Sequence, residues 1–344
     1  MNPESKYEAV IGLEIHVQLQ TRSKAFSSDS IEYGALPNTQ VSPISLGHPG
    51  TLPLHNAAAV EKAIMIGLAL NCDITRYNRY ARKNYFYADL PKGYQITQFD
   101  TPLCVGGTVE IKLSNGIEKS IRLTRIHMEE DTGKSMHDQD LYDTLVDYNR
   151  AGTALIEIVS EPDIRTGEEA YAFVSEIRRL VRYLEICDGN MEEGSLRCDA
   201  NVSIRPIGSP TFGTKVEVKN MNSISNVKRA IDFEIHRQAE ILNNGGSVVG
   251  ETRGFNGLAG TTFSLRKKEG VTDYRYFPEP DLPPTIISDD ILNSVRESMP
   301  ELPRSMYSRF TNNYGLSDYD ASVLIDDKYS AQFFEKIVST LPKY

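Results

Sequence analysis

Carboxylate and imidazole side chains recur on alternate residues in three segments of this sequence. They are Glu14 and His16, then His127, Glu129 and Asp131, and then Glu157 and Glu161. Carboxylate oxygens are preferred ligands of Mg²⁺, which also keeps several waters when it bridges nucleotide phosphates. A single Glu-x-His pair is weak evidence, because a charged strand face is often simply solvated. Three such segments in one chain strengthen the case for a metal–nucleotide site, and a solvated strand face remains the alternative at this point.

Two further segments place cations at alternate positions. Arg197 and Arg205 belong to one, and Lys215 and Lys219 to the other. Phosphoryl transfer depends mainly on positioning and on neutralising phosphate charge, so carboxylates for a metal and cations for phosphate form a matching set. We expect Arg197 and Lys219 to contact phosphate; the alternative is a solvated or structural role. The sequence has no P-loop, protein-kinase lysine motif or helix-opening GxGxxG, so a nucleotide would have to bind on an open sheet.

The spacing of apolar residues predicts the elements that position these side chains. Apolar and polar residues alternate with period two, as in strands with one buried and one wet face, in residues 7–20, 122–131, 153–161, 195–205 and 214–219. Helical periodicity, which begins with a capping-box pattern at Thr166 in the second case, covers residues 56–70, 166–185 and 225–242. Strand clusters with occasional helices predict an α+β fold on a mainly antiparallel sheet.

The composition is that of an ordinary globular chain, with 344 residues, 40% hydrophobic and 24% charged. No apolar run approaches the roughly 18–20 residues that span a bilayer, so we expect a cytoplasmic protein without membrane contact. The net charge of −10 lacks the basic footprint of a protein that holds nucleic acid alone. The chain therefore binds no nucleic acid, or it touches only a terminus. Four cysteines without a CxxC pair favour buried thiols over a disulfide framework.

A change of composition divides the chain. Proline is dense in residues 277–284, which predicts a stiff connector, and residues 289–344 read as short helices without alternating strands. We therefore expect one domain over residues 1–290 and a helical one over residues 291–344.

Six segments resemble, in the same order, the motifs of the B subunit of tRNA-dependent amidotransferases. They are residues 10–19, 82–98, 127–135, 149–159, 192–201 and 273–281. The resemblance covers the chain from about residue 7 onward. It implies a cradle domain whose sheet is related to those of glutamine synthetase and the guanido kinases, followed by a helical domain. An archaeal tRNA(Gln)-specific relative shares the cradle but carries an inserted domain, which is not seen between these motifs.

The resemblance also implies a reaction. The family uses ATP to phosphorylate the side-chain carboxylate of Glu-tRNA(Gln) or Asp-tRNA(Asn), and ammonia from the glutaminase A subunit then displaces the phosphate. A small C subunit completes the heterotrimer. The family's Mg²⁺ site maps onto Glu14, His16, Glu129 and Glu157, all on the polar faces described above. A scaffold that only docks the A subunit is the rival from another class, and retention of these acids argues against it.

The resemblance also suggests an ammonia gate. Lys83, Lys92 and Glu130 match the family's charged gate residues, and Glu130 has the opposite strand parity to Glu129. The alternative is a buried ion pair that merely holds the loop. Three roles are open for the aromatic residues of the same motif: they line the tunnel, form a subunit interface or belong to the ordinary core. These residues are Tyr85, Phe86, Tyr87 and Tyr94.

Two departures from the family are visible. Many members hold a zinc knuckle on cysteines near residues 26–47, where this chain has Ser27, Asp29, Ser42 and Ser45, so we expect no structural zinc. Members also continue into a helical tail that holds the tRNA body. This chain ends at residue 344, so we expect a C-terminally truncated form without that tail.

Overall fold

The computed structural model describes residues 6–137, 139–267 and 273–340. The strands of its main sheet are β1 (Tyr7–Gln18), β2 (Asp73–Ile74), β4 (Ala81–Asn84), β5 (Tyr94–Thr97), β6 (Cys104–Val105), β7 (Thr108–Lys112), β8 (Glu118–Glu130), β11 (Ala154–Ser160), β12 (Leu196–Pro206), β13 (Val216–Lys219), β14 (Glu251–Asn256), β15 (Thr261–Lys267) and β16 (Phe277–Pro278). Two small sheets pair β3 (Tyr77–Asn78) with β17 (Thr285–Ile286) and β9 (Lys134–Met136) with β10 (Leu145–Asp147). The helices are α1 (Ala57–Ala69), α2 (Gly167–Tyr183), α3 (Ile224–Asn243), α4 (Asp289–Ser298), α5 (Pro303–Tyr314), α6 (Asp318–Leu324) and α7 (Lys328–Thr340).

The main sheet follows the path β15–β14–β13–β12–β1–β11–β8–β5–β4–β16. Its pairings in the described residues are antiparallel except for β13 with β14, which is parallel. The strands predicted from period-two spacing and the helices predicted from helical spacing are all present, with small shifts at their ends. A mixed fold on a large, mainly antiparallel sheet is therefore confirmed.

Strand β1 shows why one face of the sheet is buried and the other carries polar groups. Ile11, Leu13 and Ile15 have no exposed surface. Glu14 and His16, at the alternate positions of the strand, are partly exposed. Successive side chains of a strand point to opposite faces, so this alternation sends the apolar set into the core. Fully burying each such side chain contributes about 1.5–3 kcal/mol.

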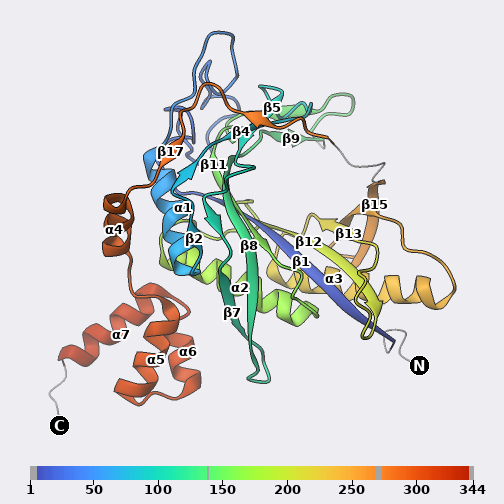
Figure 1. The fold of residues 1–344 in the computed structure, drawn as a ribbon, viewed down its shortest axis with the longest axis vertical. Helices are drawn as coiled ribbons and strands as arrows, with labels where there is room; N and C mark the ends of the chain where they lie inside the picture. The colour runs from blue at the N-terminus through green and yellow to red at the C-terminus, as the bar shows by residue number, and fades with distance from the viewer. Residues whose placement is uncertain (1–5, 138, 268–272, 341–344) are drawn as a thin grey trace.

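Helices α2 and α3 cover the apolar face of the sheet (Figure 1). The Thr166 side chain caps α2 by accepting a hydrogen bond from the Glu169 N–H at 3.1 Å, as the capping-box pattern predicts. Phe173, Val174 and Ile177 then form a fully buried stripe against the strands. The opposite, polar face of β1, β8, β11 and β12 is left free to form a site.

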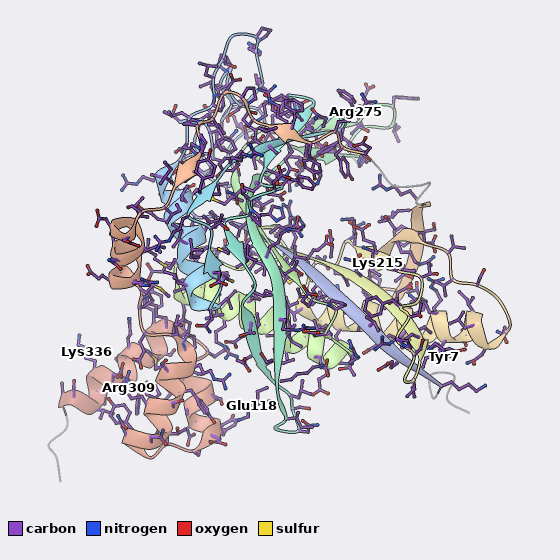
Figure 2. The ribbon with its side chains drawn as sticks, in the orientation of Figure 1. Tyr7, Glu118, Lys215, Arg275, Arg309 and Lys336 are labelled. Carbon is purple, nitrogen blue, oxygen red and sulfur yellow. The ribbon has the colours of Figure 1, made fainter. Side chains whose placement is uncertain are left out.

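The described residues have two hydrophobic cores. Leu292 and Val295 of α4 belong to the larger core, while Met306 and Phe310 of α5 begin the smaller one with α6 and α7. The small helical group lies beside the β7–β8 hairpin, where Arg304 donates to Glu118 at 3.1 Å (Figure 2). Among the described residues, no helix is long and apolar enough to cross a membrane.

The segment around residues 273–281 is fastened to the edge of the sheet by the β16–β4 pairing and by ion pairs of Arg82 with Glu279 and Asp281. Arg82 of β4 donates two hydrogen bonds to the Glu279 carboxylate, at 2.7 and 2.8 Å, and the Glu279 side chain is fully buried. Such a planar, bidentate pair has a defined geometry as well as strength. It holds Tyr274 and Tyr276 over the polar face, where they are close to Lys83.

All four cysteines are free and buried, as predicted. Burial raises the pKa of Cys72 to about 12 and that of Cys187 to about 11, so the reactive thiolate is scarce at neutral pH. We expect a thiol-specific colorimetric reagent to label none of the cysteines in the native protein at pH 7.5, and all of them after denaturation. Rapid labelling of native protein would contradict the buried assignment.

Candidate active site

Four neighbouring strands bring the polar side chains into register. In the β1–β12 pair, Glu14 lies opposite Asp199 and His16 lies opposite Arg197. In the β1–β11 pair His16 also lies opposite Glu157. Directly opposed residues of an antiparallel pair have their Cβ atoms only about 4.5–5.5 Å apart on the same face. Residues distant in the sequence therefore form one continuous polar surface.

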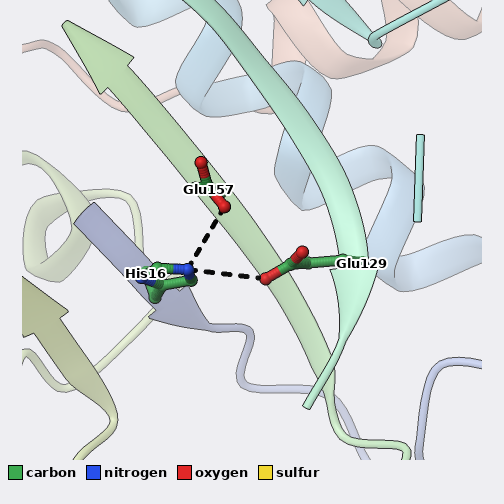
Figure 3. Close-up of side chains that lie close together, drawn as sticks. All are labelled: His16, Glu129 and Glu157. Carbon is green, nitrogen blue, oxygen red and sulfur yellow. Dashed lines mark ion pairs between the residues drawn. The ribbon is translucent and has the colours of Figure 1, made fainter. Parts of the chain in front are cut away.

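His16, Glu129 and Glu157 form the centre of this surface (Figure 3). The His16 Nε2 atom is 3.2 Å from Glu157 Oε2 and 3.7 Å from Glu129 Oε1. His127 of β8 stands beside them, with its Nε2 atom 3.7 Å from both carboxylates. Each of the three central residues offers a ligand atom, and these atoms lie within 4.8 Å of one another, so a single cation could contact them together.

The electrostatics of this cluster are strongly coupled. Burial alone would lower the pKa of His16, but the hydrogen bond to Glu157 and the charges of Glu157 and Glu129 raise it to about 9. Burial alone would raise the pKa of Glu157, but His16 and His127 hold it below its usual value. Perturbed groups of this kind, together in a cavity, mark a candidate functional site.

Glu14 joins a second acid cluster that sequence reasoning did not identify. Its partners as possible ligands are Asp199 of β12 and Glu217 of β13, again with ligand atoms within 4.8 Å. Asn201 donates a hydrogen bond to Glu14 at 2.9 Å. Burial raises the pKa of Glu14, and the negative charges of Glu157 and Asp199 raise it further. The polar parity of Asp199 and Glu217 was evident from the sequence, but the strand pairing that joins them to Glu14 was not.

Both clusters suit divalent cations. One set contains three carboxylates, which match the oxygen preference of Mg²⁺, and the other mixes one imidazole with two carboxylates, which suits Mg²⁺ or Mn²⁺. The crowding of like charges that raises the pKa of Glu14 is relieved when a cation binds. The residues present therefore fit one or two divalent cations.

The first cluster, together with Asp199 of the second, lines a chamber of about 620 Å³ that is also lined by cations. Arg197 reaches it but donates to Asp131 at 3.0 Å, and Lys219 pairs with Asp199 and with Glu217 at 3.1 Å. Lys83 lines the same chamber, and the negative charge of Glu129 raises its pKa against the opposing effect of burial. Three cations thus stand beside the acids. Glu161 lies apart, where it accepts a hydrogen bond from Thr124 at 2.7 Å.

Lys92 and Glu130 lie in a different cavity, while Lys83 stays with the acids. Lys92 forms an ion pair with Glu130, whose carboxylate also accepts from the Ile96 N–H at 2.9 Å. This smaller cavity holds about 70 Å³ and is lined by Lys24 as well. Glu129 and Glu130 are consecutive residues of β8, so the strand separates the cavity from the acid chamber.

Lys24 is a buried charge that sequence reasoning missed. Its side chain has no exposed surface, and its ammonium donates to the Gln40 carbonyl at 2.8 Å. Burial lowers its pKa to about 8. A single lysine just after a predicted strand carries no sequence pattern that distinguishes it from a solvated one.

The aromatic residues of the same motif divide between several environments. Tyr85 lines the acid chamber, whereas Phe86 is 89% exposed. Tyr87 is exposed as well, and its hydroxyl accepts a hydrogen bond from Arg266. Tyr94 lies under the Arg82 guanidinium, 4.2 Å from its carbon to the ring centroid. They do not share one role.

Ser27, Asp29, Ser42 and Ser45, which the resemblance sets against zinc-binding cysteines, are gathered into one hydrogen-bonded cluster. The Asp29 carboxylate accepts from the Ser42 N–H and hydroxyl, each at 2.9 Å, and from the Ser45 hydroxyl. The hydroxyls of Ser27 and Ser45 lie 3.1 Å apart. Burial opposes ionisation of Asp29, but these donors lower its pKa. Hydrogen bonds thus connect residues 27–29 to residues 42–45.

Comparison with known proteins agrees with the resemblance. The model of the GatB/GatE catalytic domain matches residues 9–293. A protein of Thermodesulfovibrio yellowstonii, named as the B subunit of an aspartyl/glutamyl-tRNA(Asn/Gln) amidotransferase, is 53% identical over 97% of this chain and 70% of its own length. Proteins of the same name from Synechococcus sp. strain JA-3-3Ab and Geobacter sp. strain M21 are each 54% identical, over 97% and 98% of this chain and 69% and 71% of their own lengths.

A family model that matches most of the chain, and relatives above 50% identity along nearly all of it, agree with the six motifs and with the acid-bearing sheet. The chain therefore belongs to the GatB/GatE family, the family of the tRNA-dependent amidotransferase B subunits.

Proposed function

We propose that this chain activates the side chain of a misacylated tRNA with ATP and transfers ammonia to it, converting Glu-tRNA(Gln), Asp-tRNA(Asn) or both to the amidated forms. It would work with a glutaminase A subunit and a small C subunit. The observation that carries the proposal is the cluster of His16, Glu129 and Glu157, which lines one chamber with Asp199 and with three cations, Arg197, Lys219 and Lys83. Metal ligands and phosphate-binding cations within one cavity suit phosphoryl transfer.

The first step would be attack of the substrate carboxylate on the γ-phosphorus of ATP. The new O–P bond forms as the bond to the departing ADP breaks, which gives an acyl phosphate. Mg²⁺ held by His16, Glu129 and Glu157, with a second ion near Glu14, would neutralise phosphate charge when bound. Arg197 and Lys219 would turn from their carboxylate partners toward phosphate oxygens.

In the second step ammonia attacks the carbonyl carbon of the acyl phosphate, inorganic phosphate leaves, and a proton is lost to yield the amide. We propose that ammonia enters past the Lys92–Glu130 ion pair. Glu130 faces the small cavity while the adjacent Glu129 faces the acid chamber, so the gate would stand one strand away from the reacting group. Lys83 lies on the chamber side of this partition and would receive the ammonia rather than admit it.

If ammonia enters past this ion pair, Lys92→Ala should impair amidation driven by glutamine but not amidation driven by free ammonia. Glutamine-driven amidation should fall by at least about tenfold, equivalent to about 1.4 kcal/mol on the barrier. Amidation driven by free ammonia should stay within about twofold of wild type, because the acid chamber is intact. Both rates would be measured in the assembled complex.

A matched control for this prediction is Lys336→Ala, since Lys336 is exposed on α7 and far from both cavities (Figure 2). It should alter neither rate. Equal loss with glutamine and with free ammonia in Lys92→Ala would show that the ion pair holds the loop instead of gating ammonia.

The proposed reaction is tested most directly by its first step. With ammonia and glutamine withheld, the assembled complex should cleave ATP in a burst that requires both Mg²⁺ and misacylated tRNA. Hydroxylamine should trap the acyl phosphate as a hydroxamate on the tRNA-bound amino acid. Assays with Glu-tRNA(Gln) and Asp-tRNA(Asn) separately would establish the preferred substrate. ATP cleavage at the same rate with and without misacylated tRNA would refute side-chain activation.

We infer that residues 1–290 form a cradle domain related to glutamine synthetase and the guanido kinases, and that a helical domain follows from residue 291 onward. The family model ending at residue 293 and the separate core around Phe310 support this division.

We also expect no structural zinc, because serine hydroxyls and one carboxylate occupy the positions expected for the zinc knuckle. Stoichiometric zinc on elemental analysis of the purified protein would overturn that expectation.

A further inference from the structure

A second chamber adjoins the acid chamber and has a different lining. It encloses about 450 Å³. Its walls are Lys83, Tyr85, Tyr87, Lys219, Thr252, Leu265, Arg266 and Tyr274. Lys83, Tyr85 and Lys219 also line the acid chamber, so the two spaces share a wall. A molecule in this tyrosine chamber would therefore lie next to the chamber that holds the candidate metal ligands.

Tyrosine rings form one side of the tyrosine chamber. The Tyr85 ring centroid lies 5.7 Å from that of Tyr87 and 6.1 Å from that of Tyr274, in edge-to-face arrangements. Tyr87 is 57% exposed. Stacking of a nucleobase on an aromatic side chain is worth about 1–3 kcal/mol and tolerates any base. The rings thus provide a surface that a flat base can cover.

Cations stand among these rings although the whole chain has a net charge of −10. The Lys83 ammonium lies 5.1 Å from the Tyr274 ring centroid, and Arg266 donates to the Tyr87 hydroxyl at 3.0 Å. Lys219 completes the set at the shared wall. Aromatic rings interleaved with cations are characteristic of surfaces that bind single-stranded nucleic acid.

Another pocket adjoins the acid chamber and has no cations in its described lining. There Asn220 and Asn222 lead into an open pocket of about 560 Å³, lined further by Asn226, Phe255, Asn256, Gly257, Leu258 and Phe263. This described lining contains no lysine or arginine. A polynucleotide needs cations for its phosphodiesters, whereas amides and rings are enough for a lone base. Charge therefore favours the tyrosine chamber for the polynucleotide.

We propose that the tyrosine chamber binds the single-stranded 3′ end of the aminoacyl-tRNA. The terminal adenine stacks on Tyr87, Arg266 meets the phosphodiester that precedes it, and the terminal ribose lies at the wall shared with the acid chamber. The esterified amino acid then reaches the ligands around Glu157. This inference rests on the proposed function and adds to it the place of the tRNA terminus.

Kinetic constants of the assembled amidotransferase test this placement, with free ammonia as the nitrogen source. Tyr87→Ala should raise the KM for misacylated tRNA about tenfold, as the loss of one base–aromatic stack predicts. Arg266→Ala should raise it as well and weaken its dependence on salt. Neither variant should change the KM for ATP. Tyr87→Phe keeps the ring and should behave as wild type, and Tyr142→Ala, which removes an exposed tyrosine outside the chambers, serves as the matched control.

The outcomes are separable. A raised KM for ATP in Tyr87→Ala would place the adenine of ATP in the tyrosine chamber and overturn the inference. An unchanged KM for tRNA, or a Tyr87→Phe variant as impaired as Tyr87→Ala, would also overturn it. A wild-type complex that forms no amide from ATP, ammonia and misacylated tRNA would instead defeat the proposed function.

A measurement on the wild-type complex does not depend on how the variants fold. An oligonucleotide with the 3′-terminal sequence of tRNA should inhibit competitively against aminoacyl-tRNA. The same oligonucleotide with an abasic terminal residue should inhibit about tenfold more weakly. Equal inhibition by the two oligonucleotides would mean that the terminal base is not stacked, and competition against ATP would assign the chamber to the nucleotide.

Discussion

Glu157→Gln should reduce ATP-dependent amidation by about 10²-fold or more while leaving the fold intact. Glu157 is the carboxylate closest to His16 and also lies beside His127, so it is central to the first cluster. A metal ion supplies several kcal/mol of transition-state stabilisation, and each 1.36 kcal/mol is about a tenfold change in rate. The amide has the shape of the carboxylate but not its charge, and the Mg²⁺ concentration for half-maximal activity should rise.

The stability of the same variant should fall modestly at neutral pH. His16 and His127 hold the pKa of Glu157 below its usual value, so the charged carboxylate stabilises the fold, and its loss outweighs the relief of repulsion at Glu14. The midpoint of thermal unfolding should therefore drop by a few degrees or less, too little to explain the loss of activity. Glu161→Gln is the matched control, because Glu161 follows the same strand but contacts Thr124 outside the chamber. Full activity in Glu157→Gln would favour a scaffold that only docks its partner over a catalytic subunit.

Glu234→Gln should destabilise the protein by about 3–5 kcal/mol, the usual cost of removing one partner from a buried ion pair. The Glu234 side chain is fully buried in α3. Its carboxylate accepts from Arg237 at 2.8 and 3.0 Å and lies 3.1 Å from the Arg253 Nε atom. Neutralising it removes the carboxylate that Arg237 contacts and one of the two that Arg253 contacts, since Arg253 keeps its ion pair with Glu251. The free energy of unfolding would be obtained from urea denaturation.

A control on the same helix makes this result specific. Glu240 is exposed and pairs with His236 at 3.2 Å, so Glu240→Gln should change the free energy of unfolding by less than about 0.5 kcal/mol. Because Arg253 belongs to β14, loss of the Glu234 contacts should loosen the β14–β15 hairpin first. Amide hydrogen exchange in that hairpin should accelerate more than in β1; uniform acceleration would indicate global destabilisation without a local weak point.

The local elements of this fold were readable from the sequence because each strand face has a strict period. The alternation of Ile11, Leu13 and Ile15 with Glu14 and His16 is sufficient to predict β1. The hairpin of β14 and β15 was not predicted, because Gly254 and the register shift after Thr252 interrupt its alternation. Parallel pairing of β13 with β14 likewise depends on the long connection through α3, which leaves no local trace.

The residues of the candidate site were named from the sequence, but their grouping in space was not. His16, Glu129 and Glu157 share a cluster, whereas Glu14 lies with Asp199 and Glu217. Residues i and i+2 of a strand share a face but are nearly 7 Å apart, too far to meet at one point unless neighbouring strands fill the gap. Which strands are neighbours is a matter of tertiary register, and that information is absent from any single segment.

The alternation of Glu129 and Glu130 on β8 has a consequence for how the sequence can vary. One backbone separates the two cavities, so the identity of each chamber is encoded by odd and even positions along a single strand. A one-residue deletion within β8 before Glu129 would turn each of the two carboxylates toward the opposite cavity. A substitution changes one side chain, whereas a shift of register along the strand reverses inside and outside at once.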